Sequence, residues 1–293
     1  MAEGDSPAAD RERLIAAMNR YLEALDARDA RRLPIAPTLR CTENTRELPL
    51  GTGLWRTIRG RRPGGHWFAD ADRGQVEYWG AVDEMGAEAI HAVRLAIEGR
   101  LITEIETLVI RGQGTRGQSG SFFEPAVVAQ PDPDFHRVLG PAERVPRERL
   151  IAIANHYFDA IELSDGRGLP VADACRRLVN GVVDSMLDPA QAPQGESHRA
   201  LGVAEQMTAG HYAYIEALRA RRFPIVDESR GIAVCHVLFD HPGDLQRADG
   251  QIPFRTPNSM LAYEAFKVRG GILEAVWAIG TALPYGIDCG WPI

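Results

Sequence analysis

Three ionisable side chains, His91, His236 and Glu264, interrupt otherwise apolar faces of predicted β-strands. Successive side chains of a strand point to opposite faces, so each face is formed by every second residue. An imidazole or carboxyl on an apolar face shifts its pKa unless it is paired, which suits it to general acid–base catalysis near neutral pH. The three strands are expected over residues 89–98, 232–239 and 260–269.

The strands that carry His236 and Glu264 are expected to be neighbours in the second half of the chain. We therefore predict that these two side chains form a His–carboxylate pair in one pocket. Glu264 is the better placed of the candidates, because a buried glutamate without a partner is rare. Two alternatives stay open, namely that each histidine is an ordinary core or interface residue and that Glu264 forms a structural ion pair with Arg176.

Six further residues are candidates for contacting a substrate. A tyrosine hydroxyl or an asparagine amide in a pocket can stabilise a developing oxyanion, and aromatic rings can pack against an aromatic substrate. Three of the six recur in both halves of the chain, which favours a scaffold role for those three. The substrate-binding candidates are Tyr157, Asn180, Arg176, Tyr214, Trp277 and Glu43.

No motif for a metal, a nucleotide or a covalent nucleophile accompanies these residues. His91, His236 and His241 lack a compact ligand spacing such as HExxH. The glycine-rich run over 112–121 lacks the Gly-Lys-Ser/Thr ending of a phosphate-binding loop, and there is no GxSxG or dinucleotide fingerprint. The sequence therefore predicts chemistry without a cofactor and with no bound metal.

The elements that must position these residues form a tandem repeat, because five identities recur at one spacing without a gap. Such a repeat indicates two copies of one structural unit. The matched pairs, all 136 residues apart, are Arg13 and Arg149, Tyr21 and Tyr157, Pro34 and Pro170, Arg40 and Arg176, and Asn44 and Asn180.

Each copy is expected to contain one long helix, then an irregular segment, then a curled antiparallel sheet, which is an α+β fold. Apolar residues at helical spacing predict helices over 10–27 and 147–163. Turn residues predict hairpins at 70–74, 99–100, 227–231 and 270–271. We predict one domain over 1–111, a linker over 112–146 that packs across the domains, and a second domain over 147–293.

The composition limits the classes of partner. With 293 residues, 45% hydrophobic residues and a net charge of −7, the chain has material for two cores but lacks the basic surface that nucleic acids or anionic membranes need. No apolar run approaches a membrane span, and residues 1–10 do not resemble a signal peptide. The four cysteines show no disulfide framework, so we expect reduced thiols in a cytoplasmic protein.

A helix with one apolar face, followed by a strongly curved sheet, resembles the cone-shaped α+β barrel of the nuclear transport factor 2 (NTF2) superfamily, and most closely its SnoaL-like, polyketide-cyclase-like branch. The resemblance is carried by the opening Arg-Leu-Ile-Ala helix with Tyr21 or Tyr157, and by the strand over 99–106. It implies two such barrels in tandem, related to the cystatin-like fold. The functions it implies range from isomerases, dehydratases, aldol cyclases and epoxide hydrolases to binding modules, and no catalytic set carries over residue by residue.

We therefore expect a cofactor-independent lyase, dehydratase or isomerase that acts on a small apolar, aromatic or polyketide-like molecule. Proton abstraction by a histidine or glutamate would be followed by elimination or isomerisation. The second copy is the expected place of the pocket, because it holds two of the three inward polar groups. The alternatives are a non-catalytic small-molecule-binding or dimerisation module and an epoxide-type hydrolase. A small molecule is the expected partner, and a homodimer stays open.

Overall fold

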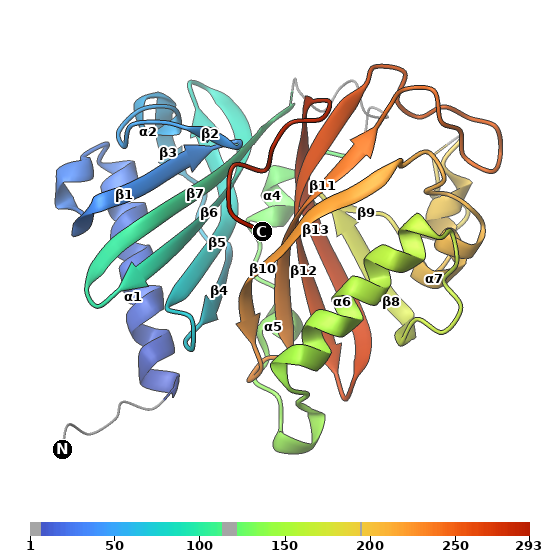
Figure 1. The fold of residues 1–293 in the computed structure, drawn as a ribbon, viewed down its shortest axis with the longest axis horizontal. Helices are drawn as coiled ribbons and strands as arrows, with labels where there is room; N and C mark the ends of the chain where they lie inside the picture. Colours follow the sequence, from blue (N-terminus) through green and yellow to red (C-terminus); the bar gives the residue numbers. More distant parts are fainter. Residues whose placement is uncertain (1–6, 113–121, 194) are drawn as a thin grey trace. The chain divides into compact units, whose positions relative to one another are not determined.

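The computed structural model describes residues 7–112, 122–193 and 195–293. The chain divides into two units, of which unit 1 comprises Met1–Arg111, Pro125–Pro131 and Gly290–Pro292, while unit 2 holds the remaining residues. Each unit is a mixed α+β structure with one long helix and one sheet (Figure 1), so the predicted fold class of two helix-on-sheet barrels in tandem is confirmed. The exact domain and linker bounds stay a prediction.

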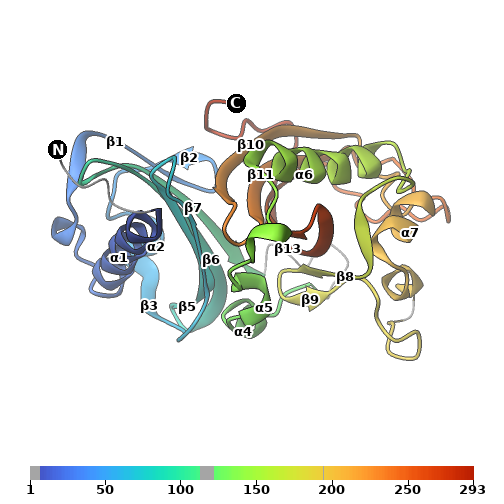
Figure 2. The ribbon, with the colours of Figure 1, turned by 90° about the horizontal axis from the view of Figure 1, so that it is seen from below.

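Unit 1 is a long helix packed on a seven-stranded sheet of order β2-β1-β7-β6-β5-β3, with β4 paired to β5. Helix α1 contacts β3, β4 and β5, and Figure 2 shows it in the hollow of the curved sheet. The elements are α1 (Pro7–Asp26), the 3-10 helix η1 (Ala30–Arg32), β1 (Ile35–Glu43), β2 (Arg46–Glu47), α2 (Leu54–Thr57), β3 (Ile58–Arg61), β4 (His66–Asp70), β5 (Gln75–Glu84), β6 (Ala87–Glu98), β7 (Leu101–Arg111) and α4 (Pro125–Val128).

Unit 2 repeats this plan around a six-stranded sheet of order β10-β11-β12-β13-β8-β9. Helix α6 lies against β10 and β11 and also contacts α7 (Figure 2). The elements are α5 (Pro133–His136), η2 (Pro141–Glu143), α6 (Arg147–Glu162), β8 (Val171–Val179), β9 (Val182–Val183), η3 (Ser197–Ala200), α7 (Val203–Thr208), β10 (Ala217–Asp227), β11 (Ile232–His241), β12 (Asn258–Arg269) and β13 (Ile272–Pro284).

The four predicted hairpins are present, but the prediction of an irregular segment and a wholly antiparallel sheet is wrong. In each unit the segment after the long helix contains a strand, β1 or β8, that pairs in parallel with the last long strand, β7 or β13. Much of β1 is exposed or half-buried, and Pro37 interrupts it, so its sequence lacks the alternation that marks a strand. The sheets are therefore mixed.

The helices are held by apolar stripes at the spacing the sequence predicts. In both helices the buried positions recur every three or four residues, so that one face is covered by the sheet. Burial of each large apolar side chain contributes about 1.5–3 kcal/mol to the hydrophobic term. The stripe of α1 includes Leu14, Met18, Tyr21, Leu22 and Leu25, and that of α6 includes Leu150, Ile153, Tyr157, Phe158 and Ile161.

An asparagine clamp explains why Asn44 and Asn180 recur. Asn44 Nδ2 donates to the Val109 carbonyl at 3.0 Å, and the Val109 N–H donates back to Asn44 Oδ1 at 2.8 Å. Asn180 makes the same two bonds with Gly280, at 3.0 Å and 2.8 Å. Both asparagines have a left-handed backbone, with φ of 49° and 47°, which asparagine tolerates better than most residues. These residues fasten the turn after β1 or β8 to the last strand.

We expect Asn180→Ala to lower the free energy of unfolding by about 1–3 kcal/mol, because it removes two buried hydrogen bonds and puts alanine at a positive φ. Urea denaturation followed by circular dichroism measures the change. Asn44→Ala is the matched variant in unit 1 and should lose a similar amount. A loss below about 0.5 kcal/mol for both variants would contradict the clamp.

Candidate functional site

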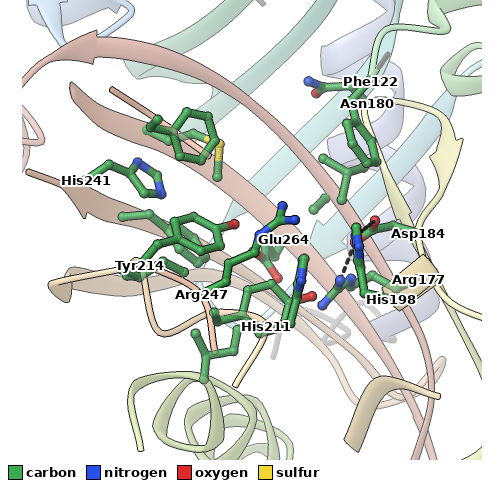
Figure 3. Close-up of a pocket in the computed structure, with 18 of the residues that line it drawn as sticks. Phe122, Arg177, Asn180, Asp184, His198, His211, Tyr214, His241, Arg247 and Glu264 are labelled. Carbon is green, nitrogen blue, oxygen red and sulfur yellow. Dashed lines mark hydrogen bonds and ion pairs between the residues drawn. The ribbon is translucent and has the colours of Figure 1, made fainter. Parts of the chain in front are cut away.

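Unit 2 contains a cavity of about 110 Å3 on the concave face of its sheet. One buried water needs about 10–15 Å3 on such a measure, so the space holds several waters or one small molecule. It is smaller than the ~300–1,000 Å3 pockets that hold drug-sized ligands. Its walls come from α6, β8, β11, β12 and β13, together with the segments before and after α7 and the loop between β11 and β12 (Figure 3).

Glu264 on β12 is the acidic group of this cavity. Its side chain is buried, and its Oε2 atom has no hydrogen-bond partner among the described residues. Burial raises the pKa of Glu264 to about 7, against the opposing effects of the Arg177 charge and a hydrogen bond with Tyr157. Near neutral pH this carboxyl can therefore both accept and release a proton.

Arg177 on β8 is held by a network of buried partners. Its Nη2 donates to the Asp184 carboxylate in a buried ion pair and to Gln206 Oε1 at 2.7 Å. Its Nη1 lies 3.4 Å from the Tyr157 hydroxyl. Gln206 also accepts from the Tyr212 hydroxyl at 2.9 Å and donates to the Asp184 carbonyl at 2.6 Å. Both side-chain groups of Gln206 are thus engaged, and Arg177 stays charged next to Glu264.

Aromatic rings and neutral histidines form another wall of the cavity. His198 and His211 stack with ring centres 3.6 Å apart. Burial and the neighbouring arginines lower the pKa of His198 to about 3. The pKa of His211 is lowered even more than that of His198, by burial and by the charges of His198 and the arginines. Burial lowers the pKa of His241 to about 4. These imidazoles are therefore uncharged at neutral pH.

Among the described residues of unit 1, the corresponding place is filled, because smaller or apolar residues replace the charged ones. The clamp residues Asn44 and Asn180 are 136 residues apart, and the same spacing makes Cys41 the counterpart of Arg177. Their partners Val109 and Gly280 are 171 residues apart, and that spacing makes Val93 the counterpart of Glu264. The interior of unit 1 beside Tyr21 is filled by Trp55, which packs edge-on against that ring at 5.4 Å. The space left there is about 10 Å3.

Four of the predicted site residues line the cavity. They are Glu264, Tyr157, Asn180 and Tyr214. The side-chain amide of Asn180 is hydrogen-bonded to Gly280 in the clamp. The second half of the chain was also the predicted place of the pocket, and the cavity lies there. The assignment of catalytic and binding roles to these four residues stays a prediction.

The predicted pairing of His236 with Glu264 is wrong, because the two side chains lie on opposite faces of the sheet. Glu264 is the cross-strand neighbour of Cys235, whereas His236 is opposite Tyr263. His236 stacks on the Tyr263 ring with centres 3.4 Å apart, and its Nδ1 lies 3.3 Å from Arg222 Nη2. A shift of one residue in register reverses the face of every side chain, and the strand-face pattern did not show which register is formed.

Two predicted substrate contacts also lie away from the cavity. Arg176 is exposed on β8, and its neighbour Arg177 is the buried arginine. Arg176 was selected because it matches Arg40 in the repeat, but the arginine that reaches the cavity is its neighbour Arg177. Trp277 is on the other face of β13 from the cavity-lining Ala278, and its ring packs against Phe135 at 5.6 Å.

The two remaining candidates belong to unit 1 and have structural surroundings there. Glu43 accepts from the Leu54 N–H at 2.8 Å and pairs with Arg111 at 3.2 Å, so it anchors α2. His91 is completely buried on the core face of β6, with both ring nitrogens unpartnered among the described residues. Burial lowers the pKa of His91 to about 3, and His91 lines neither cavity described above.

Several residues of the cavity and of the Arg177 network are missing from the predicted site. The sequence pattern did not single out Arg177, Gln206, His198 or Arg247. The alternation of Cys175 and Arg177 along β8 was a usable signal, because both are buried and the residues between and before them are exposed. For residues in loops no periodicity exists, so only the tertiary structure brings them to the cavity.

Possible metal ligands and thiols are the remaining reactive groups of the described ranges. These ranges contain no group of three or more His, Cys, Asp or Glu arranged to hold a metal ion. Burial raises the pKa of Cys41 to about 11 and that of Cys175 to about 12, so both are thiols at neutral pH. In the same part of the chain, no helix has both the length and the apolar character needed to cross a membrane.

Residues 143–280, which fall within unit 2, match a family model described as "Domain of unknown function (DUF8021)". The cavity-lining residues are within this range, except for Phe122. A search of curated proteins finds no match.

Solved structures with NTF2-like and polyketide-cyclase descriptions are similar to this chain. A candidate polyketide cyclase from Xanthomonas campestris pv. campestris is 17% identical, with 45% of this chain and 90% of that chain covered and a TM-score of 0.31. A candidate polyketide cyclase from Silicibacter sp. is 14% identical, with 46% and 90% covered and a TM-score of 0.32. An NTF2-like protein from Cytophaga hutchinsonii is 14% identical, with 47% and 99% covered and a TM-score of 0.29.

Each of these matches corresponds to about half of this chain and to most of the other chain. At such identities a likeness concerns the fold alone. The long helix on a curved sheet that the helix and strand pattern predicted is seen directly in each unit.

Exchanging the two adjacent arginines of β8 for alanine tests the buried network. We expect Arg177→Ala to lower the free energy of unfolding by about 3–5 kcal/mol, because it leaves the Asp184 carboxylate buried without its partner. Arg176→Ala is the matched control, and its change should stay within about 0.5 kcal/mol because that side chain is exposed. Chemical denaturation measures both, and equal losses would contradict the assignment.

The pKa of Glu264 also makes stability depend on pH. The unfolded carboxyl loses its proton near pH 4.5 and the folded one near pH 7, so between these values the folded state binds more protons. The free energy of unfolding therefore falls as pH rises through this window, by about 2–3 kcal/mol for this group alone, and the loss is complete above pH 7.

We expect Glu264→Gln to remove this pH dependence. Relative to the wild type, the variant should gain about 2–3 kcal/mol of unfolding free energy between pH 5 and pH 8, measured by urea denaturation at each pH. Glu23→Gln, which changes an exposed carboxyl of α1, should follow the wild-type curve. Parallel curves for Glu264→Gln and the wild type would show that the carboxyl has an ordinary pKa.

Proposed function

We propose that unit 2 is a cofactor-independent enzyme that moves a proton on a small, largely apolar molecule, as an isomerase, a dehydratase or another lyase. The observation that carries this proposal is the Glu264 carboxyl, which presents an unpartnered oxygen in a buried cavity. Its pKa near 7 allows it to act as a base and then as an acid at neutral pH.

In the proposed reaction, Glu264 removes a proton from a carbon next to a carbonyl group. The electrons of the C–H bond move into the adjacent carbonyl, so a negative charge develops on its oxygen. The Tyr157 hydroxyl and the Arg177 guanidinium, which both adjoin Glu264, are suited to stabilise that charge because they are already oriented and desolvated.

The intermediate then has two exits that balance atoms and charge. Protonated Glu264 can return its proton to another carbon of the same molecule, which is isomerisation. Alternatively, the electrons expel a leaving group from the neighbouring carbon and form a double bond, and the proton of Glu264 goes to the departing group, which is elimination. Neither exit requires an oxidant, a reductant or a bound cofactor.

Non-catalytic ligand binding is the second candidate, and one observation favours it. Arg177 Nη2, the Asp184 carboxylate and the Gln206 amide are bonded within one network rather than directed toward a ligand. A binding protein needs such rigidity but no titrating carboxyl. The two candidates therefore differ in whether Glu264 exchanges protons with a bound molecule.

Proton exchange in D2O, followed by NMR, tests the proposed chemistry. The probes are cyclohexanone, acetophenone and 3-oxocyclohexanecarboxylate, whose α-protons are replaced by deuterium when a base removes them. We expect the full chain to accelerate exchange on at least one probe, and Glu264→Gln to reduce the rate by about 10²–10⁴-fold while retaining the fold. The control Glu23→Gln should match the wild type.

No acceleration on any of the three probes would overturn the proposed acid–base function. Equal rates for wild type and Glu264→Gln would overturn the role of Glu264. Binding of a probe, seen by ligand-observed NMR without any exchange, would favour the non-catalytic binding function instead.

A further inference from the structure

A cation without a carboxylate partner lies in the cavity of unit 2. Arg247 belongs to the loop between β11 and β12 and extends toward the middle of the cavity (Figure 3). Its Nε atom is buried and has no hydrogen-bond partner among the described residues. Its guanidinium carbon lies 5.5 Å from the centre of the Tyr214 ring. In the same set of residues it forms no ion pair with a carboxylate.

The other charges of the cavity do not neutralise Arg247. The Asp184 carboxylate is bound to Arg177, so these two cancel one another. Glu264 is influenced by Arg177 and Tyr157, and with its proton in place it adds no negative charge. His198 is uncharged, because burial and the surrounding arginines, Arg247 among them, lower its pKa. With Glu264 protonated, the lining residues therefore carry two arginine charges against one aspartate charge, and with Glu264 ionised the two signs balance.

Next to this charge stands a surface of aromatic rings. The rings of Tyr214, His241 and Phe254 lie 4.5–5.5 Å from one another and all line the cavity. Such rings favour contact with another flat ring. The cavity volume of about 110 Å3 limits the ligand to a small molecule.

The loop that supplies these groups exists only in unit 2. In unit 1 the corresponding strands, β5 and β6, are joined by just Met85 and Gly86. In unit 2 the connection between β11 and β12 covers residues 242–257 and brings both Arg247 and Phe254 into the cavity. The insertion therefore accompanies the cavity and is absent from the unit whose interior is filled.

From these observations we infer that the ligand of unit 2 is a small monocyclic molecule with one carboxylate. The carboxylate pairs with Arg247, and the ring lies against Tyr214 and Phe254. A charge-assisted bond to a guanidinium is strong where water is excluded. The inference rests on the proposed function for what happens next at Glu264, but binding of the carboxylate does not depend on it.

Titration calorimetry on the full chain tests the inference with benzoate and with its neutral counterpart benzamide. We expect benzoate to bind at least about tenfold more tightly, since one charge-assisted hydrogen bond has an effect of that size. Arg247→Gln should abolish this preference, and Arg247→Lys should retain part of it. The matched control is Arg255→Gln, an exposed arginine of the same loop, which should leave the preference unchanged.

Equal affinities for benzoate and benzamide, or a preference that survives in Arg247→Gln, would overturn the inference. The outcome is separable from that of the proposed function by the exchange probes. If Arg247→Gln slows exchange of 3-oxocyclohexanecarboxylate but not that of the neutral ketones, both ideas stand. If exchange needs Glu264 but is indifferent to Arg247 on every probe, the acid–base function stands and the carboxylate inference fails.

Discussion

The buried ion pair of Arg177 and Asp184 is the constraint on which the architecture of unit 2 depends. A guanidinium inside a protein is stable only when its donors are satisfied, and removal of a single partner is costly. The two Nη groups of Arg177 bond to side chains from separate segments: Tyr157 on α6, Asp184 after β9 and Gln206 on α7. One side chain thus ties together the helix, the edge of the sheet and the segment that covers the cavity, and it fixes the surroundings of Glu264.

The two units show what happens to one scaffold with and without that constraint. Both keep the long helix, the parallel strand after it and the asparagine clamp. Where unit 2 has Arg177 and Glu264, unit 1 has Cys41 and Val93, and the interior beside Tyr21 is closed by Trp55. An apolar interior can be packed to completion, whereas buried charges need polar partners and leave space between them. The charged residues of the cavity are therefore unmatched between the units, whereas Tyr157 and Asn180 line the cavity although they are matched.

In the chemistry proposed for unit 2, the charged groups have three different roles. The charges of Arg177 and Asp184 cancel one another, Glu264 can change its charge near neutral pH, and the buried Nε of Arg247 has no hydrogen-bond partner among the described residues. The first supports the structure, the second suits proton transfer and the third suits recognition of an anion. Each role depends on the low dielectric of a buried cavity, where the same groups interact far more strongly than in water.

The sequence by itself determined the tandem repeat, the α+β class, the two amphipathic helices and the hairpins. These depend on local periodicity and on turn residues, which act over a few positions of the chain. It also singled out Glu264 and Tyr157, because alternation along β12 and the stripe of α6 show which side chains point to the interior. The partner of Glu264 was misidentified as His236, since the loop over 242–257 is too long for turn geometry to set the register. Only the tertiary structure decided that register and brought Arg177, Asp184 and Arg247 into one cavity, because contacts between distant segments follow no pattern that the chain displays locally.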